Sequence, residues 1–150
     1  MRLADLLVLD RVSLDQTTSS KKSLLEQAAS LLGSAPDAAP GRDIFQGLCQ
    51  RERLGSTGLG HGVAIPHCRV EQPGAVGALL RLKRPIDFDS PDAEPVDLFF
   101  ALAVPSSCSE AHLKLLAGIA ELFSDPDQRE RLRSLETSDE LLRVLDEQDP

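Results

Sequence analysis

The run from Val96 to Val104, V-D-L-F-F-A-L-A-V, constrains the fold more than any other stretch of this 150-residue chain. It is nearly continuously apolar, whereas a strand with one face in water alternates between apolar and polar residues. Pro105 follows directly, and proline has no amide hydrogen to donate to a neighbouring strand. We therefore predict a central strand that ends at Pro105 and is covered on both faces.

Segments with helical periodicity lie on both sides of this strand in the sequence. The expected helices are residues 21–32, 43–54, 110–123, 126–135 and 139–145. Their expected N-cap residues include Ser20, Asp125 and Thr137. In the second helix we expect Ile44, Leu48 and Leu54 to face inward. Further strands are expected at 12–14, 63–65 and 75–82. This order of elements predicts an α/β or α+β sandwich, with helices packed on a small sheet.

Composition excludes several classes of function. The net charge of −8 opposes broad binding to a phosphate backbone, and the chain has neither Trp nor Tyr to stack on bases. The chain has no apolar run long enough for a membrane span and no signal-peptide pattern. The cysteines Cys49, Cys68 and Cys108 are widely spaced, which fits reduced thiols. We expect one cytoplasmic domain over residues 1–150, without a nucleic-acid partner or stable membrane insertion.

The segment from Arg51 to Val70, R-E-R-L-G-S-T-G-L-G-H-G-V-A-I-P-H-C-R-V, carries the candidate chemistry. Its four glycines permit tight turns that side chains would forbid. The apolar residues 63–65 predict a short buried strand, and we expect Pro66 to end its hydrogen-bond ladder. His67 would then stand at a strand end, exposed enough to react and held by a stiff neighbour.

His67 is the candidate nucleophile. A large fraction of an imidazole is neutral near its ordinary pKa, so the ring needs no special activation at neutral pH. Attack on phosphorus gives a phosphohistidine, a labile phosphoramidate that suits onward transfer. The phosphoryl group is anionic and requires cations or hydrogen-bond donors around it. Arg51, near the end of the second helix, and Arg69, two residues after His67, are the candidate cations.

His112 is the second candidate residue. It begins a helical stripe that continues through Leu115, Ile119 and Phe123, so it lies at the inward edge of that helix. The helix follows the central strand, and α/β sheets commonly carry function beyond the carboxyl ends of their strands. From its position alone, a partly buried structural histidine bonded to backbone explains His112 equally well.

Simpler interpretations exist for the other candidates. His67 could be a solvated loop histidine, and Arg51 a surface charge paired with Glu52. Cys68 is disfavoured as a thiol nucleophile acting with His67, because adjacent strand residues point to opposite faces.

Metal and nucleotide binding find little support in the sequence. A zinc site assembled from His61, His67 and Cys68 with Cys108 or His112 matches no common ligand spacing. The glycines lack both a G-x-G-x-x-G fingerprint and a Walker lysine. We therefore expect no metal and no cofactor.

The segment R-E-R-L-G-S-T-G-L-G-H-G-V-A-I-P-H resembles the signature of the EIIA type-2 (mannitol/fructose-type) domains of the bacterial phosphoenolpyruvate-dependent phosphotransferase system. Within that family it resembles most the nitrogen-related branch. The motifs P-I-D-F-D, P-V-D-L-F-F-A-L-A-V-P and H-L-K-L-L support the resemblance, which extends over nearly the whole chain.

The resemblance implies an α/β sandwich whose mixed sheet of about five strands is flanked by helices on both faces. It implies that His67 is phosphorylated, that His112 stabilises the phosphohistidine and that Arg51 contacts the phosphoryl group. The donor would be an HPr-like phosphocarrier protein. The nitrogen branch generally acts by phosphorylation-dependent binding to regulatory target proteins. On this basis we expect a phosphotransferase component rather than an autonomous catalyst.

Two positions depart from the family pattern. The family usually has Gly where this chain has Cys68, and Asn where it has His61, so a third histidine is expected to border the site. Two other functions stay open: a binding module that acts without phosphorylation, and the IIA component of a fructose/mannitol-type sugar transport system.

Overall fold

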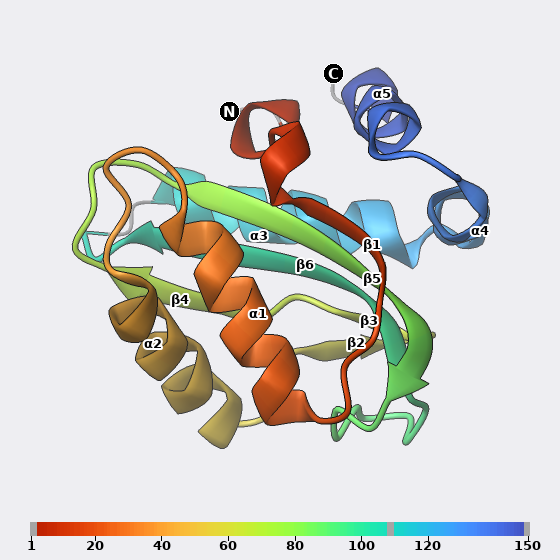
Figure 1. Ribbon diagram of the computed structural model, residues 1–150, viewed down its shortest axis with the longest axis horizontal. Helices are drawn as coiled ribbons and strands as arrows, with labels where there is room; N and C mark the ends of the chain where they lie inside the picture. Colours follow the sequence, from red (N-terminus) through yellow and green to blue (C-terminus); the bar gives the residue numbers. More distant parts are fainter. Residues whose placement is uncertain (1–2, 108–109, 149–150) are drawn as a thin grey trace.

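The computed structural model describes residues 3–107 and 110–148, which form a mixed sheet with helices on both faces (Figure 1). The strands are β1 Val12–Gln16, β2 Gly58–Gly60, β3 Val63–Ala64, β4 His67–Val70, β5 Val76–Ile86 and β6 Val96–Pro105. β6 lies antiparallel to β5 and parallel to both β3 and β4. β1 pairs with β5 at one edge, and β2 pairs with β3 at the other. The α/β class and the mixed sheet are confirmed.

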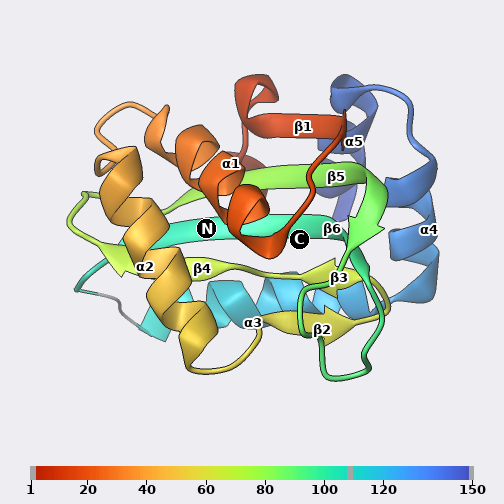
Figure 2. The ribbon, with the colours of Figure 1, turned by 60° about the horizontal axis from the view of Figure 1, so that its bottom comes forward.

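The helices divide between the two faces of the sheet (Figures 1 and 2). Their bounds are α1 Lys21–Gly33, α2 Gly41–Arg53, α3 Glu110–Ser124, α4 Pro126–Ser134 and α5 Ser138–Gln148. α1 and α2 cover one face, whereas α3, α4, α5 and an N-terminal 3-10 turn, Leu3–Leu6, cover the other. None of the described helices is long and apolar enough to cross a membrane.

β6 is the strand on which both hydrophobic cores are built. Phe99, Ala101 and Ala103 belong to the core beneath α1 and α2. Phe100 and Leu102 alternate with them and belong to the core beneath α3. Each fully buried Leu or Phe side chain contributes about 1.5–3 kcal/mol relative to exposure. The prediction of a central strand covered on both faces is confirmed.

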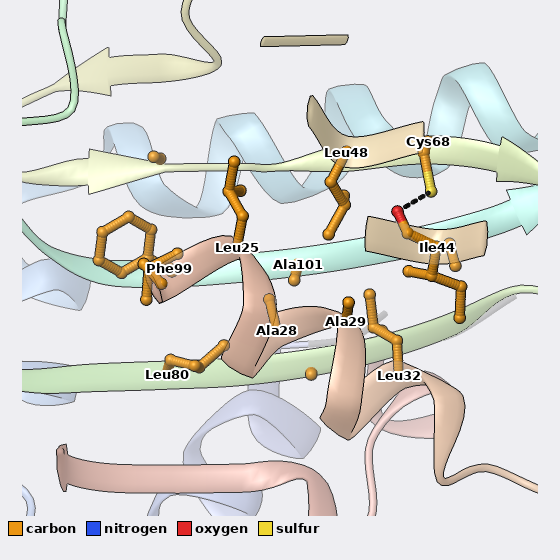
Figure 3. Packing of buried hydrophobic residues seen from close by; sticks show 14 of the residues in the cluster. Leu25, Ala28, Ala29, Leu32, Ile44, Leu48, Cys68, Leu80, Phe99 and Ala101 are labelled. Carbon is orange, nitrogen blue, oxygen red and sulfur yellow. Dashed lines mark hydrogen bonds between the residues drawn. The ribbon is translucent and has the colours of Figure 1, made fainter. Parts of the chain in front are cut away.

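Small residues let the first pair of helices approach the sheet closely (Figure 3). Ala28 and Ala29 of α1 face the sheet, and both they and Ala101 of β6 are buried. Leu25 and Leu32 extend from α1 at either side of these alanines and fill the space next to them. This interdigitation of small and large side chains gives a protein interior its crystal-like density.

The predicted N-cap residues are found at the starts of three helices. The Ser20 hydroxyl accepts a hydrogen bond from the amide of Ser23 at 3.1 Å at the start of α1. Asp125 accepts from the amide of Asp127 at 2.9 Å, and Pro126 occupies the first position of α4. Thr137 accepts from the amide of Glu140 at 3.2 Å. Each bond satisfies an amide that would otherwise lack a helical partner.

Leu54 is the main error in the predicted core. Its side chain is 85% exposed, because α2 ends at Arg53 and Leu54 lies in the turn beyond it. Glu52 takes the inward position instead and is buried. Ile44, Leu48 and Glu52 are each four residues apart, so they share one face of α2. β2 is a further strand that the sequence analysis did not anticipate.

Leu48 within α2 and Leu54 just beyond its end provide a matched test of this packing. We expect Leu48→Ala to lower the free energy of unfolding by about 2–5 kcal/mol, because Leu48 is fully buried and its truncation leaves a cavity. The same substitution at Leu54 should change it by less than about 0.5 kcal/mol. Urea unfolding followed by circular dichroism measures both, and equal losses would contradict the observed end of α2.

Candidate functional site

His67 is the first residue of β4 and lies opposite Leu102 of β6. The expectation that Pro66 ends the hydrogen-bond ladder is wrong. Pro66 separates β3 from β4, but its carbonyl accepts a hydrogen bond from the amide of Leu102 at 2.9 Å. Proline lacks only the donor, so the chain stays attached to β6 through this acceptor. His67 therefore stands at a strand end, as expected, but this end is the start of β4 and is anchored in the sheet.

The alternation of β4 assigns its side chains to two faces. Cys68 and Val70 belong to the core beneath α1 and α2, so His67 and Arg69 point to the face that α3 covers. His112 lies in the first turn of α3 and is half-buried. The structure therefore places His67 and His112 on the same side of the sheet.

One hydrogen bond determines which ring nitrogen of His67 carries the proton. Nδ1 lies 2.7 Å from the carbonyl oxygen of Ile65. A carbonyl oxygen can only accept, so the proton of the neutral imidazole is on Nδ1. The lone pair is consequently on Nε2, the ring nitrogen farther from the backbone. The ring is held in the tautomer that a nucleophile attacking through Nε2 requires.

The surroundings of His67 favour its neutral form. Burial lowers the pKa of the imidazole below its ordinary value of 6.5, and the positive charges of Arg51 and Arg69 act in the same direction. The hydrogen bond to Ile65 and the negative charge of Glu52 oppose this lowering of the pKa. Because the pKa is lowered overall, His67 keeps its lone pair throughout the neutral pH range.

Arg51 belongs to α2, which covers the face of the sheet opposite α3. It lies in the last turn of α2, is half-buried, and donates from Nη1 to the carbonyl of Gly55 at 2.8 Å. Within the described residues β4 pairs with β6 alone, so its outer edge stays open to a residue arriving from α2. The positive charge of Arg51 lowers the pKa of the His67 imidazole. The return of Arg51 toward His67 across the glycine-containing turn stays a prediction.

Cys68 is unsuited to nucleophilic chemistry. Its thiol faces the carbonyl of Ile44 in α2 at 3.7 Å (Figure 3). Burial raises the pKa of this thiol to about 12, which leaves almost no thiolate at neutral pH. Across residues 3–107 and 110–148 there is no group of three His, Cys, Asp or Glu side chains that could hold a metal ion. Cys108, which entered the zinc alternative, lies outside the described residues.

His61 does not border His67, contrary to expectation. It lies in the turn between β2 and β3, where its amide donates to Asp92 at 2.9 Å and its carbonyl accepts from Arg133 at 2.5 Å. This turn adjoins the amino end of β6, since the amide of Asp97 donates to Gly62. His67 instead pairs near the carboxyl end of β6. Residue 61 has a φ of 57°, a conformation that favours Asn and, less often, His.

Glu52 is the residue near the site that sequence reasoning missed. It was considered only as a surface partner of Arg51, but it is buried. Its position four residues after Leu48 on the apolar stripe of α2 is the signal that could have revealed this.

Comparisons with known proteins agree with this geometry. The family model described as "Phosphoenolpyruvate-dependent sugar phosphotransferase system, EIIA 2" matches residues 5–148. The chain belongs to this EIIA family. The nitrogen regulatory protein of Pseudomonas aeruginosa is 42% identical over 146 residues, covering 97% of this chain and 95% of the relative.

One solved structure at 40% identity supports the nitrogen regulatory group of this EIIA family, and a more distant one shares the fold. The crystal structure of nitrogen regulatory protein IIA-Ntr from Neisseria meningitidis superposes with a TM-score of 0.90 at 40% identity, covering 95% of this chain and 98% of that one. Mannitol enzyme IIA from Escherichia coli, in a complex with phosphorylated enzyme IIB, shares the fold with a TM-score of 0.80 at 20% identity. That match covers 95% of this chain and 98% of the other.

The departure from the EIIA pattern at Cys68 has a structural counterpart in Gly47. A Cβ at position 47 would lie 2.9 Å from Cys68 Cβ and 3.2 Å from its Sγ. Cys68 therefore fills space that a side chain at position 47 would need, and the absence of a side chain there accommodates the thiol. The two positions form one packing unit between α2 and β4.

We expect His67 to titrate with a midpoint below 6.5, because burial and two arginines disfavour its imidazolium form. The measurement is an NMR titration of the His67 ring protons, assigned by their loss in His67→Ala. The ring nitrogen shifts of the same sample report the tautomer. A midpoint above 6.5, or a ring protonated on Nε2, would contradict the geometry described here.

We expect Gly47→Ala and Cys68→Gly to be coupled. Gly47→Ala should stabilise the protein more, or destabilise it less, when Cys68 is already Gly, because the close contact is then absent. A double-mutant cycle of urea unfolding energies should show a coupling of about 0.5–3 kcal/mol. Simple additivity would mean that the two positions do not share this space.

Proposed function

We propose that this chain is a phosphohistidine carrier of the nitrogen-related phosphotransferase system. It accepts a phosphoryl group on His67 from an HPr-like phosphocarrier protein and regulates target proteins through phosphorylation-dependent binding. It works in the cytoplasm as one domain over residues 1–150. The EIIA family and the nitrogen regulatory relatives support this assignment.

The hydrogen bond between His67 Nδ1 and Ile65 carries the proposal. It leaves the Nε2 lone pair available without any proton transfer. Nε2 forms a bond to phosphorus as the bond between phosphorus and the donor breaks, and the electron pair of that bond leaves with the donor. Nδ1 keeps its proton, so the ring gains positive charge. The Ile65 carbonyl is placed to stabilise this charge, in keeping with its effect of raising the pKa of His67.

Arg51 and His112 complete the proposed site. The guanidinium of Arg51 neutralises charge on the phosphoryl group, and its planar donors suit the oxygens of that group. His112, on the α3 side that His67 faces, donates a hydrogen bond to the transferred group and stabilises the phosphohistidine. Neither residue forms a covalent bond in the transfer.

Phosphorylation then acts as a switch. Adding negative charge at the open edge of β4 changes which partner surface matches the region around His67. Only a difference in partner affinity between the two forms can transmit a signal. In this proposal the chain is a phosphotransferase component, and its phosphorylated form is the signal that partner proteins recognise.

The decisive experiment is intact-mass spectrometry after incubation with phosphoenolpyruvate, enzyme I and an HPr-like carrier. We expect one acid-labile phosphate adduct on the wild type and none on His67→Ala, because the only proposed acceptor nitrogen is then absent. Neutral to mildly alkaline pH protects the phosphoramidate. An unmodified wild type with an active donor would exclude the carrier and favour a binding module.

The role of His112 is tested by transfer rate, with His61 as a matched control. His112→Ala should remain folded and slow phosphorylation on the order of 10²-fold, as when one transition-state hydrogen-bond donor is lost. His61→Ala should transfer at the wild-type rate, since His61 lies near the other end of β6. If His112→Ala also transfers at the wild-type rate, His112 is a structural histidine only.

A further inference from the structure

A buried carboxylate lies next to the site and has no part in the chemistry proposed above. Glu52 follows Arg51 directly, and only 4% of its side chain is exposed. Oε1 accepts from the amide of Thr57 at 3.0 Å and from the Thr57 hydroxyl. Oε2 lies 2.9 Å from Nζ of Lys21 at the start of α1. A buried carboxylate is costly unless its oxygens find such partners.

Lys21 joins this carboxylate to the segment after β5. Its ammonium lies 3.2 Å from a carboxylate oxygen of Asp89 and 4.6 Å from the ring centre of Phe88. Burial disfavours the ammonium, but hydrogen bonds and charges from Glu52 and Asp89 outweigh it and raise the pKa of Lys21. The Phe88 carbonyl accepts from Lys21 at 3.4 Å and from the Ser56 hydroxyl at 2.8 Å. Three segments distant in sequence therefore meet around Glu52.

Two routes lead from Glu52 to the site residues. In the first, Thr57 is bound to Glu52 through its amide, and its carbonyl accepts from the amide of Ile65 at 3.0 Å. The carbonyl of Ile65 is the acceptor of His67 Nδ1. The carboxylate thus holds the segment whose carbonyl determines the tautomer of His67.

The second route leads to Arg51. The bond between Glu52 and Thr57 closes the turn of residues 53–56, and Gly55 of this turn offers its carbonyl to the Arg51 guanidinium at 2.8 Å. The backbone bond from the Gly55 amide to the Glu52 carbonyl at 3.2 Å belongs to the same turn. If Thr57 were released from Glu52, both the anchor of Arg51 and that of His67 would loosen.

We propose that Glu52 is a positioning residue for phosphoryl transfer: through Thr57 it holds the acceptor carbonyls of His67 and Arg51 in place, and Lys21 holds Glu52. The inference rests on the proposed function, since it concerns the same transfer. Errors of about 1 Å in the placement of reacting groups cost on the order of 10²-fold in rate. Glu52 touches neither phosphorus nor the donor, so its effect on their placement is exerted through Thr57.

The test measures single-turnover phosphorylation of the variants by a phosphorylated HPr-like carrier. Glu52→Ala should lower the limiting rate at saturating donor on the order of 10²-fold. It should leave the half-saturating donor concentration unchanged, because the buried Glu52 side chain offers almost no surface for a donor protein to contact. Glu52→Gln should lose less, since its amide oxygen can still accept from Thr57.

Lysine variants give a matched control. Lys21→Met should slow the limiting rate, whereas Lys22→Met should not, because Lys22 is the exposed neighbour of Lys21. NMR chemical shifts of the His67 ring nitrogens report its tautomer, which should not change if Glu52 only stabilises the fold. In folded Glu52→Ala, part of the ring should shift from the Nδ1–H to the Nε2–H tautomer.

Two substitutions of Thr57 test the same inference if Glu52→Ala does not fold. Thr57→Ser keeps both the amide and the hydroxyl that donate to Glu52 and should retain the wild-type limiting rate. Thr57→Val removes the hydroxyl bond and leaves only the amide bond, so it should slow the limiting rate. A wild-type limiting rate in folded Glu52→Ala would overturn the inference. Where Glu52→Ala is unfolded, a wild-type limiting rate in both Thr57→Val and Lys21→Met would overturn it. If the inference about Glu52 fails but the wild type is still phosphorylated, the proposed carrier function stands. If the wild type itself is not phosphorylated by an active donor, the proposed carrier function fails.

Discussion

The candidate site depends on the parallel pairing of β4 with β6. β3 pairs with β6 before Pro66 and β4 pairs with β6 after it. The chain stays attached to β6 between the two strands because the Pro66 carbonyl accepts a hydrogen bond from the amide of Leu102. The strand register then places His67 on the α3 face and Cys68 in the core beneath α1 and α2. A shift of one residue would exchange these faces, burying the histidine and exposing the thiol. Such a shift is costly because it would move Cys68 and Val70 out of the core and put His67 and Arg69 into it.

Around this register, backbone carbonyls rather than side chains hold the reactive groups. Ile65 orients the imidazole of His67, and Gly55 holds the guanidinium of Arg51. Carbonyls are stiffer anchors than long side chains, because they belong to a backbone that is itself hydrogen-bonded. These carbonyls hold their positions only if other contacts fix the loops to which they belong. The buried pair of Glu52 and Lys21, with Thr57, is placed to do so.

Residues near one another in sequence have separate tasks in this arrangement. His61 and His67 lie in the same glycine-containing segment, but His61 contacts Asp92 and Arg133 whereas His67 faces the α3 side. The contact between Arg133 and the carbonyl of His61 joins α4 to the turn before β3. Gly62 has no side chain there, and a Cβ would meet the guanidinium of Arg133. The contacts of His61 thus lie at the amino end of β6, whereas the candidate nucleophile His67 lies near its carboxyl end.

The sequence by itself determined the features that depend on local patterns. These were the buried strand β6, the helix starts at Ser20, Asp125 and Thr137, and the family signature that makes His67 a candidate. Only the tertiary structure decided that Glu52 is buried while Leu54 is exposed, that His61 is distant from His67, and that Ile65 selects the tautomer. Periodicity and capping are encoded within a few residues, so a sequence displays them directly. The contacts of Lys21 with Glu52 and of His61 with Asp92 join segments about 30 residues apart, and they exist only once the sheet has brought those segments together.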